Sequence, residues 1–187
     1  MRKLGVFNNA TLDGYFTGKN GDLSWAKGHM DAEFNAFVAD NATSGGLLLL
    51  GRVTYELMAS YWPTPQARKN DPVVAERMNN LPKVVFSRTL DKASWSNTRL
   101  VKGDIAAEIR KMKGEPGKDM TILGSGSIVS QLAREGLIDE YQMVVNPVVL
   151  GEGRTMFDGI KGSLTLKLTR TRTFGNGSVF LCYEPTA

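Results

Sequence analysis

Three short segments of the chain carry residue types that bind anions, and each follows an apolar run. The segments are Gly51-Arg52-Val53-Thr54, Ser87-Arg88-Thr89 and Gly124-Ser125-Gly126-Ser127. Glycine allows close approach of the backbone, hydroxyl and guanidinium groups donate to phosphate oxygens, and the first N–H groups of a following helix can bind an anion. Taken singly, each segment also fits an ordinary strand-to-helix turn with a solvated arginine. Their recurrence predicts one site for a ligand with several phosphates, such as a dinucleotide that carries a 2′-phosphate.

The third segment does not fit the fingerprint of the Rossmann dinucleotide-binding fold. The run Gly124-Ser125-Gly126-Ser127-Ile128-Val129 has valine where that fingerprint needs a third glycine or an alanine. Asp139 and Glu140 stand at the start of the next apolar run, whereas an acid that binds ribose would follow a strand. The Rossmann interpretation is therefore rejected.

The counts of ligand and nucleophile residues exclude several classes of protein. The 187 residues include one histidine, His29, and one cysteine, Cys182, so a metal site of the His/Cys zinc type and an internal disulfide are excluded. The Gly-x-Ser-x-Gly elbow of α/β hydrolases is missing. The apolar runs are too short for a signal peptide or a membrane span, so we expect a cytoplasmic protein without a membrane partner. A net charge of +4 favours anionic ligands, but the scattered basic residues argue against nucleic acid as a partner.

Apolar runs and capping residues predict alternating strands and helices. Strands are expected at residues 3–10, 47–50, 83–86, 120–123 and 141–149, the last interrupted by a proline. Helices are expected from about residue 31, over 52–61, from 71, and over 104–114 and 127–135, and a β-hairpin is expected over 164–183. We therefore expect one α/β domain over residues 1–187, with a mainly parallel central sheet, helices on both faces and an antiparallel C-terminal hairpin. Such sheets bind ligands at the carboxyl ends of their strands, where the three segments lie.

Five segments, in order along nearly the whole chain, carry a resemblance to a known family. They are Gly51 to Glu56, Phe86 to Leu90, Leu123 to Ser127, Gly136 to Tyr141 and Asn146 to Gly153. Together they resemble the dihydrofolate reductase-like superfamily, and more narrowly the reductase domain of the bacterial riboflavin-pathway deaminase-reductases and its stand-alone relatives. The zinc deaminase half of the bifunctional enzymes needs His-x-Glu and Pro-Cys-x-x-Cys, and the chain has neither motif. The resemblance implies a dihydrofolate reductase-like fold, a homodimer and NADPH as cofactor.

Carried over by position, the resemblance implies roles for individual residues. The adenosine 2′-phosphate and the pyrophosphate would be held by the first two segments, through Gly51, Arg52, Thr54, Ser87 and Arg88. The turn from Gly124 through Ser125 and Gly126 to Ser127 would cap the remaining phosphate region. The backbones of Asn9 and Phe16 would contact the nicotinamide carboxamide, and the loop from Gly18 to Trp25 would close over the ring.

Two acidic residues near the expected substrate each have two interpretations. Asp31, six residues after Trp25, matches the carboxylate that binds the pterin in dihydrofolate reductases and fits a helix N-cap equally well. Asp13 is a candidate substrate contact together with Trp25, although an Asx-turn that orients the loop is the favoured interpretation.

The resemblance implies hydride transfer from NADPH to a C=N or C=O bond of a small heterocycle. The substrate would be pterin-like, or an aminopyrimidine such as 5-amino-6-(5-phosphoribosylamino)uracil, with Asp31 or water as the proton path. A nucleotide-binding paralogue without catalysis, and a basic binder of phospho-ligands or RNA, are the alternatives.

Overall fold

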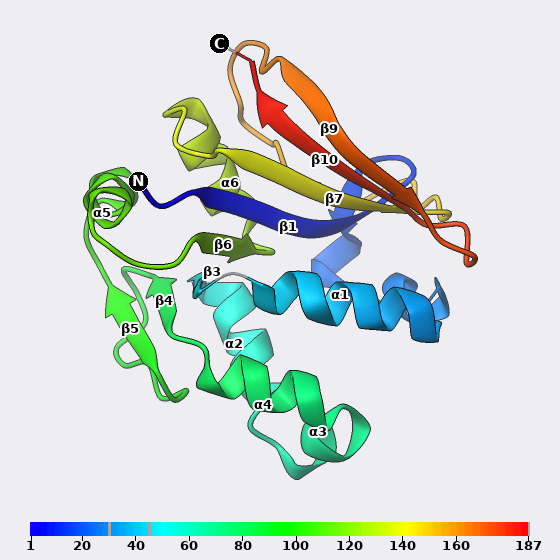
Figure 1. The fold of residues 1–187 in the computed structure, drawn as a ribbon, viewed down its shortest axis with the longest axis horizontal. Coiled ribbons are helices and arrows are strands. Elements are labelled where there is room, and N and C mark those ends of the chain that lie inside the picture. Colours follow the sequence, from blue (N-terminus) through cyan, green and yellow to red (C-terminus); the bar gives the residue numbers. More distant parts are fainter. Residues whose placement is uncertain (30, 45, 187) are drawn as a thin grey trace.

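The computed structural model describes residues 1–29, 31–44 and 46–186, and its centre is an eight-stranded sheet (Figure 1). The strands are β1 (Leu4–Thr11), β3 (Leu47–Gly51), β4 (Lys83–Phe86), β5 (Thr98–Val101), β6 (Met120–Leu123), β7 (Glu140–Asn146), β9 (Leu166–Thr173) and β10 (Val179–Pro185). Their order across the sheet is β5-β4-β3-β6-β1-β7-β10-β9. From β5 to β7 each neighbouring pair is parallel, whereas β10 runs antiparallel to both β7 and β9. The predicted fold class, including the C-terminal hairpin, is therefore confirmed.

Helices lie on both faces of the sheet. They are α1 (Ala32–Ser44), α2 (Arg52–Tyr61), α3 (Pro65–Asn70), α4 (Pro72–Asn80), α5 (Ile105–Gly114) and α6 (Gly126–Arg134), with 3-10 helices at Lys19–Gly21 and Ser24–His29. Helices α1, α2 and α4 gather on one side of the sheet, and α5 and α6 lie on the other (Figure 1). Within the described ranges, no helix is long and apolar enough to cross a bilayer.

The run Leu47–Leu50 shows why the strands of this sheet are apolar on both faces. All four leucines are buried. Leu49 belongs to the apolar cluster that contains Ile109 of α5, and Leu48 belongs to the cluster that contains Phe34 of α1. Successive side chains of a strand point to opposite faces, so a strand covered by helices on both sides needs an uninterrupted apolar run.

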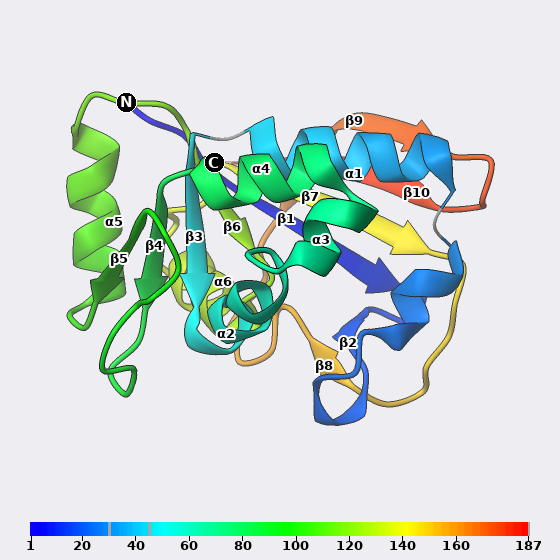
Figure 2. The same ribbon diagram turned by 90° about the horizontal axis from the view of Figure 1, so that it is seen from below.

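A second, small sheet lies beyond the carboxyl end of β1. It consists of β2 (Tyr15–Thr17) and β8 (Arg154–Thr155), which pair in antiparallel fashion. In Figure 2 the two short strands lie near the arrowhead of β1, and the arrowhead of β3 points toward α2. The small sheet therefore stands at the edge where the parallel strands end.

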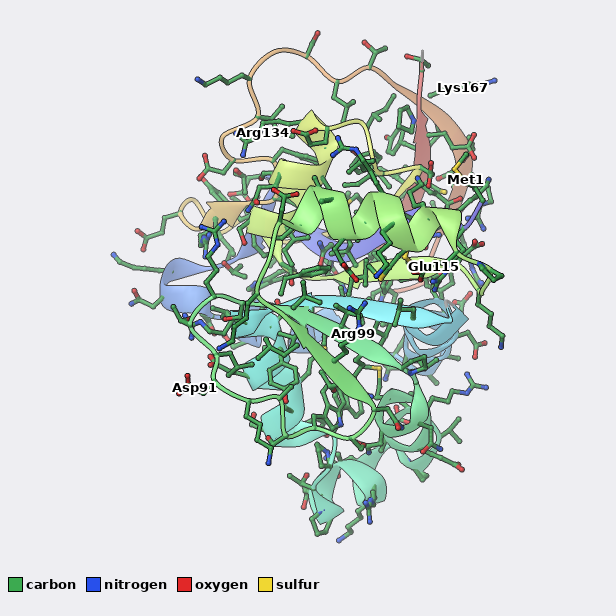
Figure 3. The ribbon with its side chains drawn as sticks, turned by 90° about the vertical axis from the view of Figure 1, so that its left-hand side faces the viewer. Met1, Asp91, Arg99, Glu115, Arg134 and Lys167 are labelled. Atoms are coloured by element: carbon green, nitrogen blue, oxygen red, sulfur yellow. The ribbon has the colours of Figure 1, made fainter. Side chains whose placement is uncertain are left out.

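Several elements differ from the sequence prediction. Strand β5, helix α3 and the β2–β8 sheet were not predicted, because each is too short to show a clear hydrophobic period. β5 is also partly polar and forms an edge of the main sheet, where Figure 3 labels its Arg99. The guanidinium of Arg99 lies 2.7 Å from the Glu108 carboxylate of α5. The strand predicted over 141–149 ends at Asn146 in β7, because Pro147 has no N–H group to donate to a neighbouring strand.

Candidate active site

The carboxyl ends of the parallel strands open into a cleft with a volume of about 2060 Å³. All three anion-type segments found in the sequence line this cleft, at the ends of β3, β4 and β6. It also includes residues 101–105 from the end of β5 to the start of α5, residues 7–9 of β1 and residues 20–26, the loop that contains Trp25. The position agrees with the general rule that open parallel sheets bind ligands beyond the carboxyl ends of their strands.

Hydrogen bonds between hydroxyl groups and the backbone join the turns after β3 and β6. The Ser125 hydroxyl oxygen accepts from the Gly51 N–H at 2.8 Å and lies 3.0 Å from the Thr54 hydroxyl oxygen. The Thr54 hydroxyl in turn accepts from the Ser125 N–H at 3.2 Å. Both hydroxyl groups, predicted as phosphate ligands, are thus also used to hold the two turns together.

Steric contacts explain why glycine occupies two positions in the turn after β6. Gly124 has a φ of 58°, and an added Cβ would lie 2.9 Å from the Thr54 hydroxyl oxygen. An added Cβ on Gly126 would lie 2.9 Å from ring carbons of Phe16, so any larger residue would have to displace this ring of β2. Ser125 itself holds the left-handed conformation, with a φ of 58°. This tight turn leaves the first N–H groups of α6 at the cleft.

The helices differ in how their N-termini are capped. The side chains of Asp31, Thr64, Asp71 and Asp104 accept from backbone N–H groups at the starts of α1, α3, α4 and α5. No side chain caps α2 or α6, which begin after Gly51 and Ser125. Among the α-helices described, the two without a side-chain cap are therefore the two that begin in the anion-type segments. Their free N–H groups and positive dipole ends favour a bound anion.

Four cationic side chains line the cleft: Arg52, Arg88, Lys102 and Arg154. The Arg52 guanidinium lies 2.9 Å from the Glu56 carboxylate, one turn later on α2. Within the described ranges, no salt bridge to a carboxylate is found for Arg88, Lys102 or Arg154. The Ser87 hydroxyl accepts from the N–H groups of Thr89 and Leu90, which shapes the turn that carries Arg88.

Sequence reasoning missed Lys102 and Arg154. Lys102 follows β5, and because that strand was not recognised, no signal marked its carboxyl end. Arg154 lies directly after the segment Asn146 to Gly153 that carried the family resemblance, and it pairs with Thr17 in the small sheet. The apolar pair Leu100-Val101 before Lys102 is too short to predict a strand.

The nicotinamide-side residues predicted from the resemblance also line the cleft. They are Asn9, Phe16 and Trp25. The Trp25 side chain is buried, and its indole N–H has no hydrogen-bond partner within the described part of the chain; the same holds for the Thr17 hydroxyl. A buried donor without a partner is costly, so both groups fit contacts to a bound ligand.

Asp13 and Asp31, predicted as a substrate contact and as the catalytic residue, do not line the cleft. One carboxylate oxygen of Asp31 accepts from the Phe34 N–H at 2.8 Å, which is the N-cap interpretation. The Asp13 carboxylate accepts from the Thr11 hydroxyl and from the N–H groups of Leu150 and Gly151. These hydrogen bonds lower the pKa of Asp13 below its ordinary value, and the bond from the Thr11 hydroxyl has the largest effect. The geometry therefore favours structural roles for both aspartates. The side chain of His29 lies outside the described residues.

The chain matches known proteins over nearly its whole length. YyaP of Bacillus subtilis (strain 168), an uncharacterized protein, is 33% identical over 174 residues, which cover 93% of this chain and 90% of YyaP. A protein assigned to riboflavin biosynthesis in Shewanella sp. PV-4 has a similar structure, with a TM-score of 0.75, 22% identity and 99% of each chain covered. Dihydrofolate reductase from Enterococcus faecalis, solved with NADP(H), gives a TM-score of 0.65 at 18% identity, covering 99% of this chain and 97% of that one.

The sheet order, the two helical layers and the cleft at the strand ends thus define a dihydrofolate reductase-like α/β protein. Residues 2–180 match the model of the RibD C-terminal domain, and the chain belongs to that family. The resemblance predicted from the sequence motifs is confirmed at both levels.

Proposed function

We propose that this protein is an NADPH-dependent reductase of a small heterocyclic substrate. The observation that carries the proposal is the pair of helices, α2 and α6, that begin at the cleft without a side-chain cap, beside cationic side chains. A dinucleotide with a 2′-phosphate offers three phosphate groups to such a site. Membership of a family whose structural neighbours include reductases supports an oxidoreductase.

The residues of the cleft fit a phosphorylated dinucleotide. The α6 N-terminus, with Gly124 and Gly126 leaving room for close approach, would hold the pyrophosphate together with the α2 N-terminus. Arg88, with Ser87 shaping its turn, would bind the 2′-phosphate, because a guanidinium can donate two parallel hydrogen bonds to it. The nicotinamide ring would then lie near Asn9, Phe16 and Trp25. When bound, NADPH supplies the hydride.

The proton for the reduced bond would come from water. The described carboxylates that line the cleft are Asp22, Asp71 and Asp104. Asp71 and Asp104 cap α4 and α5, and Asp22 accepts from the N–H and the hydroxyl of Ser24. Of the two proton paths considered from the sequence, Asp31 or water, the geometry supports water. The protein would contribute orientation and shielding of the ring by the Trp25 loop.

The 2′-phosphate assignment predicts a specific change of cofactor preference. Replacing Arg88 with alanine is expected to weaken NADPH binding about 10- to 100-fold, because a charge-assisted contact is lost. Binding of NADH, which lacks the 2′-phosphate, is expected to change less than about twofold on the same argument. Titration of nicotinamide fluorescence measures both affinities.

A matched control is Arg68→Ala, because Arg68 is an exposed arginine of α3 that does not line the cleft. Equal losses of NADPH and NADH in Arg88→Ala would refute the assignment of Arg88. No binding of either nucleotide to the wild type would refute the proposed function as a whole. Binding of NADPH without turnover of pterin, aminopyrimidine or simple carbonyl compounds would support the alternative, a nucleotide-binding paralogue without catalysis.

A further inference from the structure

Charge is divided unevenly between two parts of the cleft. The cations stand on the strand-end turns and on β8, which we call the turn half. The helical half is the part lined by α1, by the second half of α2 and by residues 70–78. Among its described lining residues the one charged side chain is Asp71, which caps α4. The cations thus lie in the half that the proposed function assigns to the phosphates of the dinucleotide. The helical half is then the part of the cleft that is left for the substrate.

Helix α2 turns an apolar stripe toward this space. Val53, Leu57 and Tyr61 are spaced four residues apart, all line the cleft, and are 64%, 51% and 39% exposed. Residues at this spacing lie on one face of a helix. Leu23, in the loop before Trp25, is another exposed apolar residue of the cleft. Exposed apolar side chains that gather in a concave site indicate a surface that a ligand covers.

Three further residues that line the cleft, Thr17, Trp25 and Asn35, carry uncharged polar groups. The Trp25 indole N–H and the Thr17 hydroxyl are buried without a partner in the described structure. The amide side chain of Asn35, on α1, also lines the cleft. Such groups pair with carbonyl oxygens and ring nitrogens of a neutral heterocycle. They do not neutralise an anion, and burying a phosphate or carboxylate without a cation is strongly unfavourable.

We infer that the substrate is an uncharged planar heterocycle without a phosphate or carboxylate tail. The inference rests on the proposed function and narrows it, because the phosphoribosyl-aminopyrimidine considered from the resemblance carries a phosphate group. In the helical half that phosphate would meet the apolar stripe of α2 and the carboxylate of Asp71.

The test compares two probes that differ in one group, 6-hydroxymethylpterin and its monophosphate. Each is titrated into the full-length protein with and without saturating NADP⁺, and pterin fluorescence reports binding. The neutral pterin is expected to bind at least about tenfold more tightly than the monophosphate, a difference of about 1.4 kcal/mol. Equal or tighter binding of the monophosphate, or no binding of either probe, would overturn the inference.

A pair of variants tests the same point by gain of function. Leu57→Arg adds a cation to the stripe and is expected to tighten binding of the monophosphate about fivefold relative to Leu57→Gln, and the gain should fall at high salt. Thermal unfolding of both variants checks that they fold. No gain in Leu57→Arg would contradict the placement of the substrate beside α2.

A separate NADPH titration without pterin keeps the two proposals distinguishable. If NADPH fails to bind, the proposed function fails. If NADPH binds and the monophosphate binds as tightly as the neutral pterin, the inference about the substrate fails and the proposed function stands.

Discussion

Gly124 shows at the level of one residue how the candidate site depends on backbone geometry. Its φ of 58° lies in the left-handed region, and an added Cβ would approach the Thr54 hydroxyl to 2.9 Å. The same turn places the start of α6 at the cleft. A side chain at position 124 would therefore cause strain and a direct clash, which would affect both folding and the proposed phosphate site.

We predict that Gly124→Ala lowers the free energy of unfolding by about 1 to 3 kcal/mol, because alanine disfavours this φ and its methyl group displaces Thr54. NADPH binding should weaken in the same variant. Urea denaturation and fluorescence titration measure the two effects. The control is Gly114→Ala, because Gly114 ends α5 with open space around it. Equal stability of the two variants would argue against the tight turn.

Residue types identified the three anion-type segments, because glycine, hydroxyl or guanidinium groups recur after three apolar runs. They did not settle Asp31, because a helix cap and a substrate-binding carboxylate look alike in a sequence. The hydrogen bond from the Phe34 N–H shows the helix cap, and the substrate role of Asp31 stays a prediction. The roles of Ser125 and Thr54 in joining two turns were also hidden, since they depend on contacts about 70 residues apart in the sequence.

Lys83 shows at the level of elements how α4 is joined to β4. Its side chain is almost fully buried, and the ammonium donates to the carbonyl oxygens of Met78, Asn79 and Leu81 at 2.8, 3.2 and 2.6 Å. It also lies 4.4 Å from the centre of the Trp95 ring. The side chain satisfies carbonyl groups at the C-terminal end of α4 that the helix itself leaves free.

Replacing Lys83 with methionine is expected to lower the free energy of unfolding at pH 7 by about 1 to 3 kcal/mol, because buried carbonyl groups lose their donor. Burial lowers the pKa of Lys83 from its ordinary 10.5 to about 8. Between these values the unfolded chain binds more protons than the folded protein, so stability rises with pH. Wild type should therefore gain stability over Lys83→Met from pH 8 to pH 10. Denaturation curves at both pH values measure this gain, and a constant difference would show that Lys83 titrates normally.

Elements marked by an apolar run were predictable, and elements without one were not. The sequence predictions for β4 and β6 agree with the structure because both are uninterrupted or nearly uninterrupted apolar runs, and the prediction for α2, residues 52–61, agrees because the helix follows the leucine run at Gly51. The β2–β8 pair has two to three residues per strand and is held by contacts between distant parts of the chain. Local sequence patterns do not indicate such contacts, which is why Arg154 was missed.

The whole molecule has a net charge of +4, and the cleft concentrates part of the positive charge at one edge of the sheet. Surface cations attract anionic ligands over distances at which salt weakens the attraction.

The homodimer implied by the family resemblance stays a prediction. Strand β9 is an edge strand with mostly exposed side chains, so it is available for such pairing.

We predict that raising sodium chloride from 50 to 300 mM weakens NADPH binding about three- to tenfold and NADH binding about twofold, because NADPH carries the additional phosphate. Isothermal titration calorimetry at several salt concentrations measures both. In Arg88→Ala the salt dependence of NADPH binding should become similar to that of NADH binding. Parallel losses for both nucleotides in the wild type would contradict a dedicated site for the additional phosphate.

The hydroxyl network of Gly51, Thr54 and Ser125 does not include Arg88, which stands on a separate turn. If Arg88 binds the 2′-phosphate as proposed, mutations at position 88 are expected to alter the preference between the two nicotinamide dinucleotides without disturbing how the neighbouring turns fold. Under the proposed function, a change of dinucleotide preference in evolution would therefore need only this one codon, whereas a change at position 125 would also remove hydrogen bonds that join two turns.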